Sequence, residues 1–352
     1  MRASIAQVLL DSGTAALVFL FVSMVLSLRW ATAAGLSYAV FPAAIYYSTN
    51  ILSESLFTFL LVGGVVAVAI GFRRDRLLLT ALGGALLAFA TLTRPIALPL
   101  PFLFAGVSLL YRGLSRRWLH YAMLILCLAL VVAPWAIRCT RASRQLVLVQ
   151  GIGPALFYVG TRSDWNQQDS GIWLRFSRTV DYGRRLAEAR NAEEIANADR
   201  LGFPLGMQNI KSNPRGYLVS RVKSYPYLFM NSFDTFTGIN KSFGTLWSEG
   251  DVLRLASKLL LMFVFAIAPF ILAWIGLIPV RRNLAAMMGA LVWLYVLAAN
   301  LPMWVEYRFW VPAVPFMLAG ATMGAHYLWA RLRGKGSFDP QPAMMQVPDS
   351  RE

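Results

Sequence analysis

The feature that most constrains this chain is a series of long apolar runs, separated by short basic segments. The nine runs cover residues 14–28, 31–46, 51–72, 77–92, 95–111, 119–137, 253–280, 284–303 and 309–330. A helix needs about 20 apolar residues to cross a hydrocarbon core of about 30 Å. Because 57% of the 352 residues are hydrophobic and 14% are charged, one large soluble core is excluded. We therefore predict an all-α polytopic membrane protein with about nine transmembrane helices.

Basic residues gather on one side of this predicted arrangement. The short connections on that side hold Arg29, Arg73, Arg74, Arg76, Arg112, Arg116, Arg117, Arg281, Arg282, Arg331, Arg333 and Lys335. The positive-inside rule makes that side cytoplasmic. The net charge of +16 is then explained by membrane topology, so we expect membrane lipids and no nucleic acid among the partners.

Four regions follow from this topology. Residues 1–137 form an N-terminal transmembrane bundle of about six helices, and residues 253–330 supply about three more. Between the sixth and seventh helices, residues 138–252 form one large extracytoplasmic loop domain. In it, residues 184–200 predict an exposed helix and residues 213–229 an amphipathic helix along the membrane surface. Residues 331–352 are predicted to be a disordered cytoplasmic tail.

The parity of the helices has a consequence for the N-terminus. Nine helices with a cytoplasmic C-terminus place Met1 outside, although the sequence from Met1 to Leu10 is not that of a cleaved signal peptide. One explanation is a further helix encoded before Met1. The other is an inverted first helix whose inner end is held by Arg29. The first explanation is favoured by the motifs described next.

Several short motifs occur at the predicted outer ends of the helices. They are QVLLDS at 7–12, FPA at 41–43, TNILSESL at 49–56, TLTRP at 91–95, APWAIR at 133–138, EYRF at 306–309 and PAVP at 312–315. In this order they resemble the polytopic GT-C glycosyltransferases of the family 39 type, relatives of the protein mannosyltransferases and lipid A aminoarabinose transferases. Members of that family begin with one cytoplasmic-to-outer helix and a loop that carries an acidic catalytic residue. The resemblance implies that this chain starts at the family's second helix.

The resemblance implies transfer of a sugar from a polyprenyl-phosphate donor at the periplasmic face of a bacterial inner membrane. The acceptor, whether glycan, lipid or protein, is left open. Such a transfer needs a carboxylate that takes the acceptor's proton and cations that hold the departing phosphate. Glu54 and Glu306 are the candidate catalytic carboxylates. The alternative role for Glu54 is that of an acid in a first helical turn that complements the helix dipole, and a simple ion pair with Arg308 is the alternative for Glu306.

The basic and aromatic candidates lie at the same predicted face. Arg94, Arg308 and Tyr307 are candidates for binding the donor phosphate, and Arg138 and Trp135 for contacting the substrate. An arginine fork suits a phosphate. The alternatives are snorkelling arginines and an interfacial aromatic belt.

The remaining candidates for chemistry are weaker. Asp11 opens the first run and is predicted to be a helix N-cap, and replacement of the missing base is its alternative role. His120 and His326 fall at cytoplasmic ends, so no histidine metal site is predicted, although a divalent ion held by carboxylates stays open. Cys127 and Cys139 are not expected to form a disulfide.

Two other functions are alternatives to the glycosyltransferase. A flippase or transporter for lipid-linked sugars would show paired repeats and charges near the middle of the membrane, whereas the charges here lie at helix ends. A non-catalytic remnant that binds a polyprenyl lipid needs no further residues and stays open.

Overall fold

The computed structural model describes residues 2–50, 52–110, 118–149, 153–165, 171–230, 243–280 and 283–334, and over these ranges it contains helices and no strands. The first part of the chain forms α1 (Arg2–Ser23), α2 (Leu28–Ala39), α3 (Pro42–Thr49), α4 (Glu54–Arg74), α5 (Leu77–Thr93), η1 (Pro95–Ala97), α6 (Leu100–Leu110) and α7 (Trp118–Ser143). The last part forms α16 (Phe243–Ser248), α17 (Val252–Met262), η2 (Phe263–Ile267), α18 (Ala268–Val280), α19 (Leu284–Asn300), η3 (Tyr307–Phe309), η4 (Val311–Ala313) and α20 (Val314–Leu332).

These helices are those of a multi-pass membrane protein. Four segments of the described chain are long and apolar enough to cross a membrane: Ser4–Ser23, Glu54–Arg74, Trp118–Ser143 and Val252–Pro279. Three shorter apolar helices are Leu77–Thr93, Pro95–Gly106 and Leu284–Asn300. Each of the nine predicted runs coincides with one or more helices, so the all-α prediction is confirmed, while the number of spans stays a prediction.

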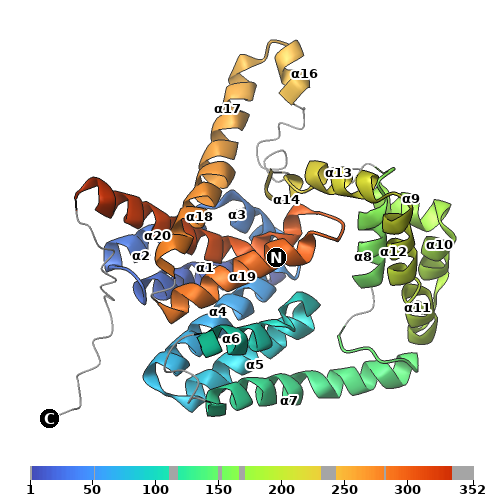
Figure 1. Ribbon diagram of the computed structural model, residues 1–352, viewed down its shortest axis with the longest axis horizontal. Helices are drawn as coiled ribbons and strands as arrows, with labels where there is room; N and C mark the ends of the chain where they lie inside the picture. Colours follow the sequence, from blue (N-terminus) through green and yellow to red (C-terminus); the bar gives the residue numbers. More distant parts are fainter. Residues whose placement is uncertain are drawn as a thin grey trace.

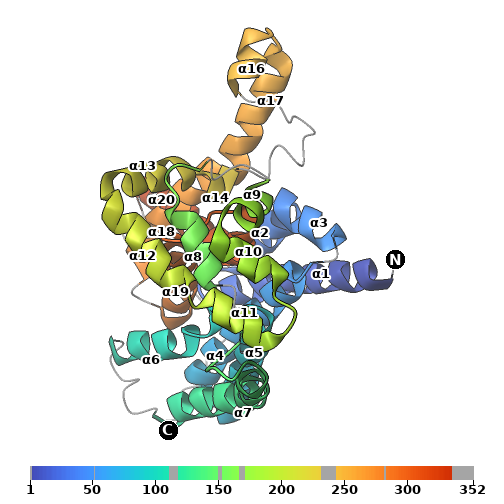
Figure 2. The ribbon, with the colours of Figure 1, turned by 90° about the vertical axis from the view of Figure 1, so that its right-hand side faces the viewer.

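Several of the predicted runs are not single α-helices, among them 31–46 and 253–280. The run 31–46 is divided between α2 and α3, because the chain leaves the helix at Val40 and starts again with Pro42 at the first turn. The run 253–280 contains a π-helical turn, η2, between α17 and α18. Figure 2 shows α16 and α17 extending away from the other helices.

The first helix begins earlier than the sequence predicts. Because α1 starts at Arg2, Asp11 lies inside the helix, and the prediction that it caps a helix N-terminus is wrong. Its carboxylate instead accepts a 2.8 Å hydrogen bond from the hydroxyl of Tyr38 on α2. The neighbouring helix supplies this partner, so Asp11 has a structural role in the packing of α1 against α2.

Glycine lets two helix pairs approach closely. A Cβ atom placed on Gly324 of α20 would lie 2.0 Å from the carbonyl oxygen of Leu272 on α18. A Cβ atom on Gly83 of α5 would lie 2.7 Å from the backbone nitrogen of Val68 on α4. Small residues at such crossings are typical of helices that associate in a membrane.

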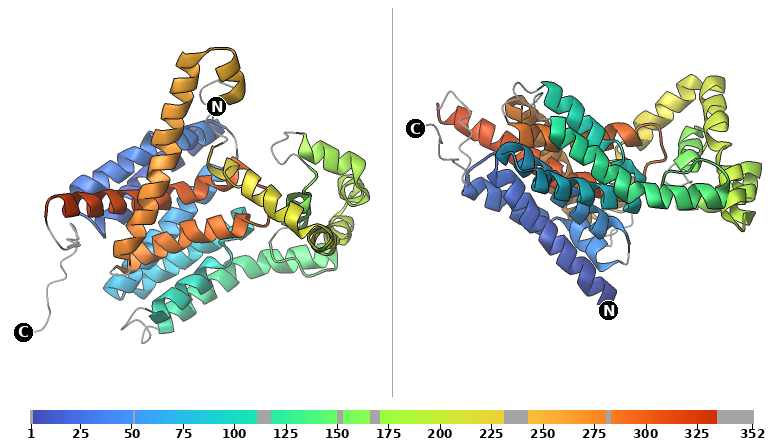
Figure 3. Two further views of the ribbon diagram at one scale, coloured as in Figure 1. Left: turned by 45° about the horizontal axis from the view of Figure 1, so that its top comes forward. Right: turned by 90° about the horizontal axis from the view of Figure 1, so that it is seen from below.

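The turns after α1 and α4 and the start of α7 lie at one end of the bundle, which we call the basic end. Arg73 Nη1 donates a 3.1 Å hydrogen bond to the Met24 carbonyl, and Asn283 Nδ2 donates to the same oxygen at 3.3 Å. His120 Nε2 lies 2.8 Å from Asp75 Oδ1. The C-terminal side of α20 is at this end too (Figure 3). The described members of the predicted cytoplasmic set thus share one end, while residues 111–117, 281–282 and the tail from 335 lie outside the described residues.

The opposite end, the loop-domain end, carries a layer of short helices (Figure 1). They are α8 (Gly153–Thr161), α9 (Ile172–Thr179), α10 (Asp181–Glu188), α11 (Ala192–Asp199), α12 (Gly202–Ser212), α13 (Pro214–Ser224) and α14 (Tyr227–Met230). The single helix predicted over 184–200 is two helices, because Asn191 caps α11 by accepting a 2.9 Å hydrogen bond from Glu194 N. The helix predicted over 213–229 is present as α13 and α14.

The loop domain has its own aromatic core. Tyr158, Phe176 and Tyr182 are buried there together with Trp304, which comes from the segment between α19 and α20. Trp304 N donates a 3.1 Å hydrogen bond to the Leu156 carbonyl. The segment 301–309 is therefore fixed between the loop domain and the membrane helices.

Candidate functional site

The junctions α3–α4 and α5–η1 bring a buried carboxylate to an arginine. Glu54 is the first residue of α4 and Arg94 follows the last residue of α5, so the two antiparallel helices place them at the same end. Arg94 Nη2 forms an ion pair with Glu54 Oε1, and their side chains are 17% and 1% exposed. Arg94 Nε also donates a 3.3 Å hydrogen bond to Ser53 Oγ. Among the described residues, Glu54 Oε2 is buried without a hydrogen-bond partner.

A second ion pair comes from the segment between α19 and α20. Arg308 Nε lies 2.6 Å from Glu306 Oε2, with side chains 35% and 33% exposed. Phe309 lies under the Arg308 guanidinium, whose carbon is 5.3 Å from the ring centroid. Trp304 and Phe309 hold this segment by their contact at 6.0 Å between ring centroids. This pair is more open to solvent than the first.

The two pairs lie within electrostatic range of each other and form one site, which we call the charge cluster: Glu54, Arg94, Glu306 and Arg308. Burial raises the pKa of Glu306, and the charge of Glu54 raises it further, while Arg308 and Arg94 oppose this rise. Burial lowers the pKa of Arg94, and among the described groups that act on it are Glu54, Arg308 and Glu306. The sequence predicted all four residues as site candidates, and the fold brings them together.

Two tyrosines border the charge cluster. Tyr307, a predicted phosphate-binding residue, lies between Glu306 and Arg308 in the sequence, and its side chain is buried. Tyr47 of α3 was not predicted, yet it lies within electrostatic range of Glu306, Tyr307 and Glu54. Ser55 Oγ donates a 3.3 Å hydrogen bond to the Tyr47 carbonyl, which holds the end of α3 against the start of α4. A tyrosine at a helix end is usually an interfacial anchor, so no local pattern marks Tyr47 as a site residue.

Trp135 and Arg138 lie apart from the charge cluster, near the end of α7. The Arg138 guanidinium carbon lies 5.4 Å from the Trp135 ring centroid. Trp135 is 41% exposed, and its Nε1 donates a 3.2 Å hydrogen bond to the Val149 carbonyl. These contacts suit the alternative role of an interfacial anchor, and substrate contact by these two residues stays a prediction.

The described residues contain no group of three or more His, Cys, Asp or Glu side chains that would hold a metal ion. The two carboxylates of the charge cluster each face an arginine rather than further acidic groups. His120 and His326 lie away from the cluster, where His120 meets Asp75 and His326 packs against Trp30 at 5.4 Å between ring centroids.

Comparison with protein-family models, curated proteins and solved structures gives no significant match for this chain. The resemblance to the GT-C glycosyltransferases thus rests on the motifs of the sequence alone.

Proposed function

We propose that this chain is the body of a membrane glycosyltransferase that takes a sugar from a polyprenyl-phosphate donor at the loop-domain end. The observation that supports the proposal most is the charge cluster. It joins two arginines and two carboxylates from separate segments, at the junction of the membrane helices and the loop domain. These are the charges that phosphate departure and proton removal require.

In this proposal the two arginines bind the donor phosphate. As the bond between the sugar and the phosphate breaks, the electron pair stays on the phosphate oxygen and its negative charge grows. Arg94 and Arg308 stabilise that charge, and an arginine fork can donate two hydrogen bonds to one phosphate.

The carboxylates have different roles because their surroundings differ. Glu54 is 1% exposed and paired with Arg94, so it positions that arginine. Glu306 is 33% exposed, which leaves it within reach of an acceptor hydroxyl. Its pKa is raised by burial, and a raised pKa makes a carboxylate a better proton acceptor near neutral pH. We therefore assign the acceptor's proton to Glu306.

A transfer assay tests this function. The protein is isolated from its own membrane and given a panel of polyprenyl-phosphate-linked hexoses and pentoses. A detergent extract of the cell envelope supplies glycan, lipid and protein acceptors, and released polyprenyl phosphate is measured. Arg94→Ala and Arg308→Ala are expected to reduce release by about a hundredfold or more, as loss of one preorganised donor does. Arg29→Ala at the basic end is the matched control and retains full release.

Normal release by both cluster variants would refute the site. If wild-type protein binds polyprenyl phosphate but releases none from any donor, the non-catalytic lipid-binding remnant is the better description. Transport is separated by reconstitution in vesicles, because a flippase moves the intact lipid-linked sugar across the bilayer without breaking the sugar–phosphate bond.

A further inference from the structure

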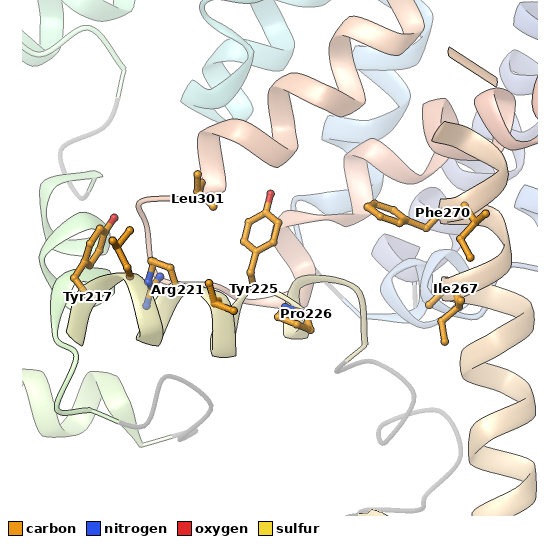
Figure 4. Close-up of a pocket in the computed structure, with 11 residues that line it drawn as sticks. Tyr217, Arg221, Tyr225, Pro226, Ile267, Phe270 and Leu301 are labelled. Atoms are coloured by element: carbon orange, nitrogen blue, oxygen red, sulfur yellow. The ribbon is translucent and has the colours of Figure 1, made fainter. Parts of the chain in front are cut away.

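A cavity of about 540 Å³ lies between α13 and the helix formed by η2 and α18. Figure 4 shows Tyr217, Arg221 and Tyr225 on one side, Ile267 and Phe270 on the other, and Leu301 at the end of α19. This volume is in the range of pockets that bind small organic ligands. Most of the lining side chains are apolar, and we call this space the α13–α18 cavity.

Among the described lining residues, Arg221 is the charged one, and it is almost fully buried, at 4% exposure. Its Nη1 donates a 2.5 Å hydrogen bond to the Met303 carbonyl. Within the described part of the chain, its Nε and Nη2 atoms are buried with no hydrogen-bond partner. A buried charge is costly unless an opposite charge and hydrogen-bond acceptors meet it. The two unpartnered N–H groups therefore favour an anion with oxygen acceptors.

No acidic side chain is found among the described residues that line the cavity. Among the described groups, the Tyr217 hydroxyl acts electrostatically on Arg221. The centroid of the Tyr217 ring lies 5.9 Å from the guanidinium carbon of Arg221. The described residues thus place a cation in an apolar wall and supply no anion beside it. A ligand with one negative charge completes this site.

The apolar wall continues onto a surface suited to lipid. Ile271 and Trp274 of α18 are 52% and 47% exposed, and Ile278 further along is 55% exposed. A hydrocarbon chain that leaves the cavity along α18 covers these side chains. A free phosphate would leave the apolar wall empty, and an uncharged lipid would leave Arg221 unpaired, so the ligand needs both a head group and a chain.

We propose that the α13–α18 cavity binds an anionic glycerophospholipid, with its phosphodiester at Arg221 and one acyl chain along α18. The proposal is independent of the glycosyltransferase function, because it rests on residues outside the charge cluster. It also gives the lipid a connection to the candidate site, since Arg221 contacts Met303 in the segment that carries Glu306.

Native mass spectrometry of the full chain in detergent tests the site with three probes. Phosphatidylglycerol carries head group and chains, diacylglycerol carries the chains alone, and glycerol 3-phosphate carries the phosphate alone. We expect phosphatidylglycerol to bind at least about tenfold more tightly than either part. Equal binding of glycerol 3-phosphate would overturn the lipid assignment, and so would tighter binding of polyprenyl phosphate in competition for the same cavity.

Three variants assign the binding to the cavity. Arg221→Gln is expected to weaken phosphatidylglycerol binding about tenfold, whereas Lys223→Gln on the exposed side of the same helix leaves it within about twofold. Ala266→Phe fills the cavity while keeping Arg221, and it is expected to weaken binding as much. Ala266→Phe keeps the test valid if Arg221→Gln disturbs the fold. Unchanged binding in Ala266→Phe would refute the proposal.

Discussion

The two ends of the helical bundle both present arginines at their turns, but the arginines have different surroundings. At the loop-domain end, Arg94 is 17% exposed and pairs with a carboxylate that is 1% exposed. At the basic end, Arg29 is exposed, and Arg333 stacks over the Trp329 ring at 4.2 Å. Arg94 thus differs from these arginines by its burial beside an acidic partner, and not by its position at a helix end.

The largest expected effect is a loss of stability when the buried ion pair of Glu54 and Arg94 is broken. Arg94→Ala leaves the Glu54 carboxylate buried without its cation, which should lower the free energy of unfolding by about 3–5 kcal/mol. Arg29→Ala at the basic end should change it by less than about 0.5 kcal/mol. Denaturant unfolding in detergent micelles measures both. Adding Glu54→Gln to Arg94→Ala should recover part of the loss, and equal losses at the two ends would refute the comparison.

A second effect concerns pH and the loop domain. Asp199 is 4% exposed, and burial raises its pKa from 3.8 to about 6, although a 3.0 Å hydrogen bond from the Tyr182 hydroxyl lowers it. Between these values the folded chain binds more protons than the unfolded chain, so stability falls as pH rises through this window, by about 2–3 kcal/mol. Asp199→Asn should remove that slope.

Tyr182→Phe tests the same carboxyl group, because it should widen the pH window that Asp199→Asn removes. It removes the hydrogen bond that favours the charged form of Asp199, so the pKa should rise further and the window should extend above pH 6. Unfolding curves from pH 4 to 8 distinguish the two variants. An unchanged slope in Asp199→Asn would show that other groups cause it.

The smallest expected effect is on the second ion pair of the cluster. Both Glu306 and Arg308 are about one third exposed, at 33% and 35%, so solvent screens their attraction. Arg308→Ala should therefore lower the free energy of unfolding by about 1 kcal/mol or less. A loss as large as that of Arg94→Ala would mean that the two pairs are equally buried in solution.

The sequence was sufficient to predict the features that depend on local composition. Long apolar runs predicted the helices, and the position of Arg73 and Arg74 at a turn predicted one shared basic end. Glu54 and Arg94 were identified by their motifs at helix ends. Their pairing was not, because residues 40 positions apart are brought together by the packing of α4 on α5.

Other features depend on tertiary contacts that no local pattern contains. The position of Asp11 inside α1 depends on its hydrogen bond to Tyr38 of another helix. The place of Tyr47 beside the cluster depends on the interruption between α2 and α3. The burial of Arg221 depends on Met303, 82 residues further along the chain, whereas the amphipathic pattern of the sequence predicted only a helix on the membrane surface.

The most direct test of the charge cluster is the dissociation constant of polyprenyl phosphate for Glu306→Gln and Arg308→Gln. If the cluster binds phosphate, Glu306→Gln removes a competing negative charge and should bind polyprenyl phosphate more tightly than the wild type, while it releases no product from a sugar donor. Arg308→Gln should bind about tenfold more weakly. If both substitutions leave binding unchanged or shift it in the same direction, the two residues form a structural ion pair, and phosphate binding by the charge cluster is refuted.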